Sequence, residues 1–170
     1  KAARVFEMLP EVDVHPDARC LTLGSLPPAP PPPAEVVVLS GGSSDRTVVA
    51  EAALALRCHG ISVDHVMDVG VAGLHRLLDQ LPRLATARIL IACAGMEGAL
   101  PTVLAGLVPQ PVIGVPVSVG YGISVGGRTA LEGMLASCAP GLTVVNIDNG
   151  YGAAMAALRI LRGVEPAELG

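Results

Sequence analysis

Five short apolar runs alternate with five helical patterns from Glu35 onward, and this alternation constrains the fold more than any other feature. The runs are continuous rather than alternating, so each is predicted to be a strand buried on both faces of a parallel sheet. Parallel strands joined by helices form right-handed βαβ units. The sequence therefore predicts an α/β fold with a five-stranded parallel sheet and helices on both faces. The predicted strands span 35–39, 61–66, 88–92, 111–115 and 142–147, and the predicted helices span 47–59, 72–81, 100–107, 129–137 and 153–161.

The composition fits one closely packed domain. Of the 170 residues, 51% are hydrophobic but only 2% are aromatic, so alanine, valine, leucine and glycine must form the core, as suits an α/β fold. Residues 1–34 carry the proline-rich stretch "LPPAPPPPAE" and are predicted to be a tail or linker. Residues 35–170 are predicted to form the α/β domain.

Charge and cysteine usage exclude several classes of function. The net charge is −4, which provides no basic field for nucleic acid or an anionic membrane. No apolar run reaches the roughly 20 residues of a membrane span, and the first residues lack the apolar centre of a secretory signal. The four cysteines favour reduced thiols in a cytoplasmic protein over two disulfides, and no CxxC or HxxxH motif indicates a metal site.

Polar and glycine-rich segments follow the predicted strands, where sheets of this type bind ligands. After the first strand, "SGGSSDRTVVAEAA" offers the hydroxyls of Ser43 and Ser44 and a capping carboxylate, Asp45. Backbone N–H groups at the start of the following helix suit a phosphate. The alternative interpretation is a capped β–α turn without function, and neither the Walker motif nor GxGxxG is present.

The segment "IACAGMEGALP" after the third strand places Gly95, Met96 and Glu97 before a helix. Glu97 is either a favourable charge at the helix N-terminus or a general base in an apolar pocket, where desolvation raises its pKa. Cys93 belongs to the strand and is predicted to lie in the core. Between the second and third predicted strands, His75 and Arg76 lie on a predicted helix, where they are either solvated positions or functional residues.

Two further segments, "VPVSVGYGISVGG" and "NIDNGYGAA", follow the fourth and fifth strands. Loops this rich in glycine, serine and asparagine approach or cover ligands. The residues predicted to contact a ligand here are Ser118, Gly120, Tyr121, Gly122, Asn146 and Asp148.

Cys138 ends an apolar helical pattern that Pro140 and Gly141 stop. Free cysteine is usually a small buried hydrophobe, but a thiolate is also a strong nucleophile. The pattern alone leaves both interpretations open.

Six segments taken in order resemble the carboxylase of nickel-pincer nucleotide cofactor biosynthesis, the LarB family. They are "SSDRTVVAEAA", "GLHRLL", "AGMEGALP", "VPVSVGYG", "GMLASCA" and "VVNIDNGYGAA", and the resemblance runs from about Ser40 to Leu161. The catalytic domain of that family is similar to the aminoimidazole ribonucleotide mutase and carboxylase of purine synthesis. The resemblance therefore implies a flavodoxin-like sheet and a homo-oligomer, tetrameric or octameric. It also identifies residues 1–34 as the last piece of an N-terminal domain that this sequence lacks.

The resemblance implies a specific activity. Members carboxylate C5 of the pyridinium ring of nicotinic acid adenine dinucleotide with CO2 or bicarbonate. They also hydrolyse its phosphoanhydride, giving AMP and pyridinium-3,5-biscarboxylic acid mononucleotide. The resemblance assigns the nucleophile to Cys138, the base to Glu97 and a phosphate contact to Ser43–Asp45. No tightly bound cofactor is implied, Mg2+ is allowed, and Asp148 is a candidate by position for activating water.

One departure concerns the site, since the family usually has threonine where this chain has Val117, so any hydroxyl contact there is lost. Two alternative functions stay open. The first is a purine-type mutase, whose relatives carry a histidine in the segment where this chain has Glu97, and the absence of that histidine argues against it. The second is a non-catalytic nucleotide-binding or oligomerisation module in which the cysteines are structural.

Overall fold

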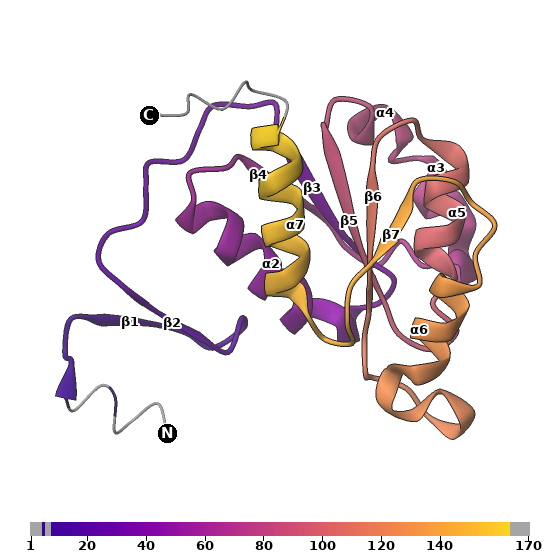
Figure 1. Ribbon diagram of the computed structural model, residues 1–170, viewed down its shortest axis with the longest axis horizontal. Helices are drawn as coiled ribbons and strands as arrows, with labels where there is room; N and C mark the ends of the chain where they lie inside the picture. Colours follow the sequence, from indigo (N-terminus) through magenta and orange to yellow (C-terminus); the bar gives the residue numbers. More distant parts are fainter. Residues whose placement is uncertain (1–4, 6–7, 164–170) are drawn as a thin grey trace.

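The computed structural model describes residue 5 and residues 8–163. Its centre is a parallel sheet between two layers of helices, with α2 and α7 on one face and α3, α5 and α6 on the other (Figure 1). The five strands lie in the order β4-β3-β5-β6-β7. The predicted three-layer α/β fold is therefore confirmed. The strands are β3 Val36–Ser40, β4 Val63–Val66, β5 Ile89–Ala94, β6 Val112–Pro116 and β7 Leu142–Val144.

Strand periodicity divides the core into two halves. Val36 and Val38 of β3 lie in the cluster that contains α2 and α7, whereas Val37 and Leu39 lie in the cluster on the opposite face. Successive side chains of a strand point to opposite faces, so a continuous apolar run supplies both clusters. The helices are α2 Arg46–Cys58, α3 Leu74–Leu78, α4 Leu81–Leu84, α5 Ala99–Leu107, α6 Arg128–Leu135 and α7 Gly150–Gly163, and the 3-10 turns are η1 Ser43–Asp45, η2 Val71–Gly73 and η3 Gly122–Gly127.

Predicted and observed elements differ in extent at several places. The predicted helix 72–81 is divided into η2, α3 and α4, because Pro82 has no N–H to continue α3 and instead fits the first turn of α4. The predicted strand 142–147 ends at Val144, and Asn146 bends the chain by accepting the N–H of Ile147 through its side-chain oxygen. Helix α6 ends at Leu135, two residues before the predicted end.

The alanine-rich surfaces of α2 and α7 pack inside the chain. Ala52 and Ala53 of α2 are buried, as are Ala153, Ala154 and Ala157 of α7. Small side chains let the two helices approach each other and the sheet closely. Ala52 and the three buried alanines of α7 therefore belong to the core on that face of the sheet.

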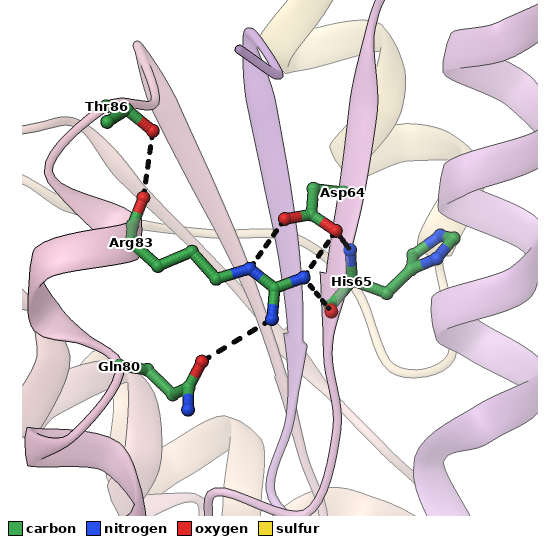
Figure 2. A network of polar contacts seen from close by, with 5 residues as sticks. All are labelled: Asp64, His65, Gln80, Arg83 and Thr86. Carbon is green, nitrogen blue, oxygen red and sulfur yellow. Dashed lines mark hydrogen bonds and ion pairs between the residues drawn. The ribbon is translucent and has the colours of Figure 1, made fainter. Parts of the chain in front are cut away.

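Strand β4 lies at one edge of the sheet and is tied to α4 by an ion pair (Figure 2). The guanidinium of Arg83 donates to both carboxylate oxygens of Asp64, at 2.7 and 2.6 Å, and to the carbonyl of His65 at 3.2 Å. This two-point contact lowers the pKa of Asp64. Both side chains remain partly exposed, so the pair fixes geometry more than it stabilises the fold.

The segment before the sheet contains a β-hairpin that the sequence patterns do not predict. Strands β1 Val12–His15 and β2 Cys20–Leu23 pair antiparallel, and the His15 ring bonds the Thr22 hydroxyl across them at 2.8 Å. Each strand has only four residues, too few for a clear alternating pattern. The hairpin and the polyproline stretch therefore replace part of the structureless tail expected for residues 1–34.

Candidate active site at the carboxyl edge of the sheet

A pocket of about 200 Å3, here called the central pocket, lies where β3, β4 and β5 end. It is lined by the loop after each of these strands and by Val119 from the loop after β6. Of the residues predicted to bind substrate, it contains Ser44, Asp45, Gly95 and Met96, together with Glu97. The carboxyl edge of the sheet, where doubly wound folds bind their ligands, thus brings together residues from separate segments.

Glycine backbones form the walls of the central pocket. The N–H of Gly70 donates to the carbonyl of Gly41 at 2.9 Å, and a Cβ on Gly70 would lie only 2.5 Å from that oxygen. A Cβ on Gly95 would lie 2.3 Å from the carbonyl oxygen of Val119. These contacts are shorter than any side chain allows, so both positions require glycine.

Asp45 turns inward and holds the β3–α2 turn in place. Its carboxylate accepts the N–H of Gly42 at 2.8 Å, and the residue is only 3% exposed. Burial raises the pKa of Asp45, and the bond from Gly42 partly opposes that rise. Ser43 and Ser44 are exposed, but only Ser44 lines the central pocket, because Ser43 faces a neighbouring hollow beside Arg46 and Asp68.

Replacing Asp45 with asparagine should change the pH dependence of stability. A carboxyl whose pKa is raised by folding keeps its proton longer in the native state. The wild-type free energy of unfolding therefore has a component that falls as pH rises from the ordinary value of 3.8 through the raised pKa. Asp45→Asn lacks this component and still accepts the Gly42 N–H. Relative to wild type, the variant should gain stability with rising pH, measured by urea unfolding from about pH 4 to about pH 8.

The exposed Asp79→Asn variant is the control and should show no comparable trend. A stability difference for Asp45→Asn that stays constant with pH, or that shrinks as pH rises, contradicts this assignment.

Glu97 stands at the rim of the central pocket, on the turn between β5 and α5. In a single chain the residue is exposed, so the apolar enclosure that was one of its two interpretations is not formed by this chain alone. Its backbone is firmly placed, because a Cβ on Gly133 of α6 would lie 2.7 Å from the Glu97 carbonyl oxygen. Met96 beside it has a positive φ of 54°.

Cys138 lies beyond α6, in the segment that leads toward the start of β7. It is exposed and lines neither the central pocket nor the second pocket described below. The structure of one chain therefore does not bring Cys138 into the pocket that holds Glu97. Cys93, by contrast, is fully buried in β5, as predicted for a core residue, and burial raises the pKa of its thiol.

A second pocket of about 240 Å3 adjoins the central pocket and shares Ser44 and Val119 with it. We call it the hairpin pocket, because the β1–β2 turn lines one side through Ala18, Arg19 and Cys20. The other side consists of the first turns of α2 and the segments after β6 and β7. Its remaining lining residues are Thr47, Val48, Glu51, Val117, Ser118 and Asp148.

Two carboxylates of the hairpin pocket bind backbone N–H groups. Asp148 accepts the N–H of Ser118 at 2.8 Å, and Glu51 accepts the N–H of Gly150 at 3.1 Å, where α7 begins. Burial raises the pKa of Glu51. Arg19, Glu51 and Gly70 were not predicted as site residues. No motif marks Arg19 or Gly70, and Glu51 lies within the quoted segment "SSDRTVVAEAA" but at a helix position where a solvated carboxylate is ordinary.

The remaining predicted residues lie outside both pockets. Gly120, Tyr121, Gly122 and Asn146 line neither of them. Tyr121 and Ile123 are instead 77% and 91% exposed. Arg76 folds back and donates to the carbonyl of Asp68 at 2.7 Å, while His75 is exposed. In the part of the chain that the structure describes, no cluster of three or more His, Cys, Asp or Glu could hold a metal ion. None of the described helices is long and apolar enough to cross a membrane.

Comparison with known proteins places this site in a family. Residues 35–168 match the AIR carboxylase family model. The uncharacterized protein MJ0165 of Methanocaldococcus jannaschii is 50% identical over 111 residues, which cover 64% of this chain and 42% of that protein. The N5-carboxyaminoimidazole ribonucleotide mutase of the same organism is 34% identical over 124 residues, covering 69% of this chain and 72% of the mutase. The chain therefore spans less than half of MJ0165 but most of the mutase. With a parallel sheet and a strand-end pocket in the matched region, this chain belongs to the AIR carboxylase family.

Proposed function

We propose that this chain is the catalytic part of a carboxylase and hydrolase that acts on nicotinic acid adenine dinucleotide. The products are AMP and pyridinium-3,5-biscarboxylic acid mononucleotide. The observation that carries the proposal is the placement of Glu97. The central pocket has two ionisable side chains, Asp45 and Glu97, and Asp45 is committed to the N–H of Gly42. Glu97 is therefore the base available to a bound substrate.

The chemistry requires a nucleophile that adds to the ring and then departs. The pyridinium ring is electron-poor, so its C5 does not attack CO2 directly. Glu97 takes the proton of the Cys138 thiol, and the resulting thiolate adds at C4, so the ring becomes a dihydropyridine whose C5 is electron-rich. C5 then forms a bond to CO2. Once Glu97 has released the first proton to solvent, it accepts the proton of C5, the C4–S bond breaks with loss of the thiolate, and the ring regains its aromaticity. Sulfur suits both addition and departure.

The separation of Cys138 from the central pocket supports an assembly as part of this proposal. In the assembly, the 136–141 segment of one copy reaches the Glu97 pocket of a neighbouring copy. Exposed apolar side chains gather in the η3–α6 region, at Tyr121, Ile123, Val125 and Leu135. Exposed apolar side chains are expected where a protein contacts a partner.

The chain is accordingly expected to sediment as a homo-oligomer, tetrameric or octameric, at micromolar concentration. Ile123→Asp should shift the distribution toward smaller species, because a charge would have to be buried at the interface. The matched change Ile160→Asp on α7 should leave the assembly intact. A wild-type monomer at micromolar concentration contradicts the assembly.

Two parallel incubations, each with a different substrate, distinguish the candidate functions. The protein is mixed with nicotinic acid adenine dinucleotide and 13C-bicarbonate, and the products are analysed by mass. The proposal expects a labelled dicarboxylated mononucleotide together with AMP. The second candidate, favoured by the similarity to the mutase, is rearrangement of N5-carboxyaminoimidazole ribonucleotide, tested in a parallel incubation. A non-catalytic module would change neither substrate.

A further inference from the structure

The turn of the β1–β2 hairpin is held against the carboxyl edge of the sheet. Ala18 is only 6% exposed. It lies in a hollow with Ala50, Ala53 and Leu54 of α2. The carboxylate of Asp17 lies 3.7 Å from the guanidinium of Arg46, the first residue of α2. Arg19, two residues after Asp17, thus stands beside the first turn of α2, where it lines one pocket with Thr47 and Val48.

Arg19 has a backbone conformation that the site residues share. Its φ is +51°, and the other described non-glycine residues with positive φ are Asp68, Met96 and Asp148. These three follow β4, β5 and β7 at the carboxyl edge. Such conformations gather at functional sites, where the surroundings hold them. The hairpin turn therefore shares this backbone feature with the loops at the carboxyl edge.

The hairpin pocket has hydrogen-bond donors without a side-chain partner among the described residues. Arg19 is exposed and forms no side-chain hydrogen bond or ion pair with any described residue. The hydroxyl-bearing residues Thr47 and Ser118 line the same pocket, as does Ser44, whose hydroxyl donates to the carboxylate of Asp45 at 3.5 Å. The carboxylates of Glu51 and Asp148 already accept backbone N–H groups. A guanidinium with several hydroxyls suits a phosphate, which Arg binds through two parallel bonds.

We propose that the hairpin pocket binds the phosphate of the adenylate half of the substrate and that Arg19 is its charge partner. This inference rests on the proposed function, because it places a dinucleotide across two adjoining pockets. The central pocket then holds the pyridinium mononucleotide, and the phosphoanhydride crosses the shared wall at Ser44 and Val119. The hairpin belongs to the substrate site.

Calorimetric binding with three probes tests this assignment. The probes are nicotinic acid adenine dinucleotide, AMP and nicotinic acid mononucleotide, each titrated into wild type, Arg19→Gln and Arg19→Lys. Losing a charge-assisted bond to phosphate costs about 1.5–3 kcal/mol, so Arg19→Gln should bind the dinucleotide and AMP about tenfold or more weakly. Arg19→Lys should retain part of the affinity. The mononucleotide, which does not reach the hairpin pocket, should bind all three proteins equally.

Arg159→Gln on the exposed side of α7 is the matched control, since it removes the same charge away from the pocket and should bind all probes normally. Equal affinities of Arg19→Gln and wild type for AMP overturn the inference, as does wild type that binds no AMP. A similar loss for the mononucleotide, or in Arg159→Gln, overturns it as well. If carboxylation fails while AMP binding still depends on Arg19, only the proposed function is rejected and the phosphate site stands.

Discussion

Cys138→Ser should fold and assemble like wild type yet form no carboxylated product. Cys138 is exposed, and serine is nearly isosteric, so little packing is lost. A hydroxyl at neutral pH does not supply the anion that adds to C4, and an alkoxide would leave poorly. Carboxylation should fall by at least roughly a thousandfold, measured as labelled product at equal folded concentration.

The other cysteines provide the controls for this result. Cys58 is exposed and Cys20 half-buried, and serine at either position should leave carboxylation near normal. Buried Cys93 is replaced by alanine instead, because burying a serine hydroxyl among apolar side chains would destabilise the fold. Near-normal carboxylation by Cys138→Ser, or a loss confined to one of these three variants, overturns the assignment.

Glu97→Gln should bind the dinucleotide with ordinary affinity and carboxylate it roughly 100- to 10,000-fold more slowly. The amide keeps the shape of the side chain but accepts no proton from sulfur. The loss should appear in kcat with little change in KM, because the carboxylate acts in the reaction rather than in binding. Glu132→Gln on α6 removes another exposed carboxylate and should be harmless apart from its bond to Arg128. A wild-type kcat for Glu97→Gln would contradict the role of Glu97 as the general base.

Mixing the two inactive variants tests whether one copy completes the site of another. If Cys138 of one copy serves the Glu97 of its neighbour, some sites of a mixed assembly hold both native residues. Co-assembled Cys138→Ser and Glu97→Gln should then regain up to about a quarter of wild-type activity, whereas separate assemblies should stay inactive. Co-assembly is checked with differently tagged copies. Co-assembled but inactive mixtures place both residues within one chain.

The sheet could be predicted because each strand carries its own signal. Runs such as Val36–Ser40 and Ile89–Ala94 are apolar on both faces, and only strands covered by helices on both sides have that pattern. The hairpin could not be predicted, because four-residue strands bury little and are held by contacts with α2 that no local pattern records. The only sequence signal for the break between α3 and α4 is Pro82, which cannot continue a helix.

The sequence predicts which segments meet at the strand ends, but not how their side chains are oriented there. The strand-end segments with Ser44, Gly95 and Met96 do meet in one pocket, since parallel topology brings their ends together. Patterns along the chain carry no information on which way a side chain turns, so the inward bond of Asp45 was missed. The pattern also left Cys138 open between a buried hydrophobe and an accessible thiol, and its exposed position in one chain argues against the first.

The glycine backbones that wall the central pocket restrict how substrate preference can change. At Gly70 and Gly95 every substitution adds atoms where main-chain oxygens already fill the space, and no residue is smaller than glycine. The pocket can therefore be obstructed at these positions but not enlarged. New specificity in this fold has to arise at the open rim, from Glu97, Val119 and the hairpin. An enzyme redesigned for a bulkier ring would be altered there, while the glycine walls were kept unchanged.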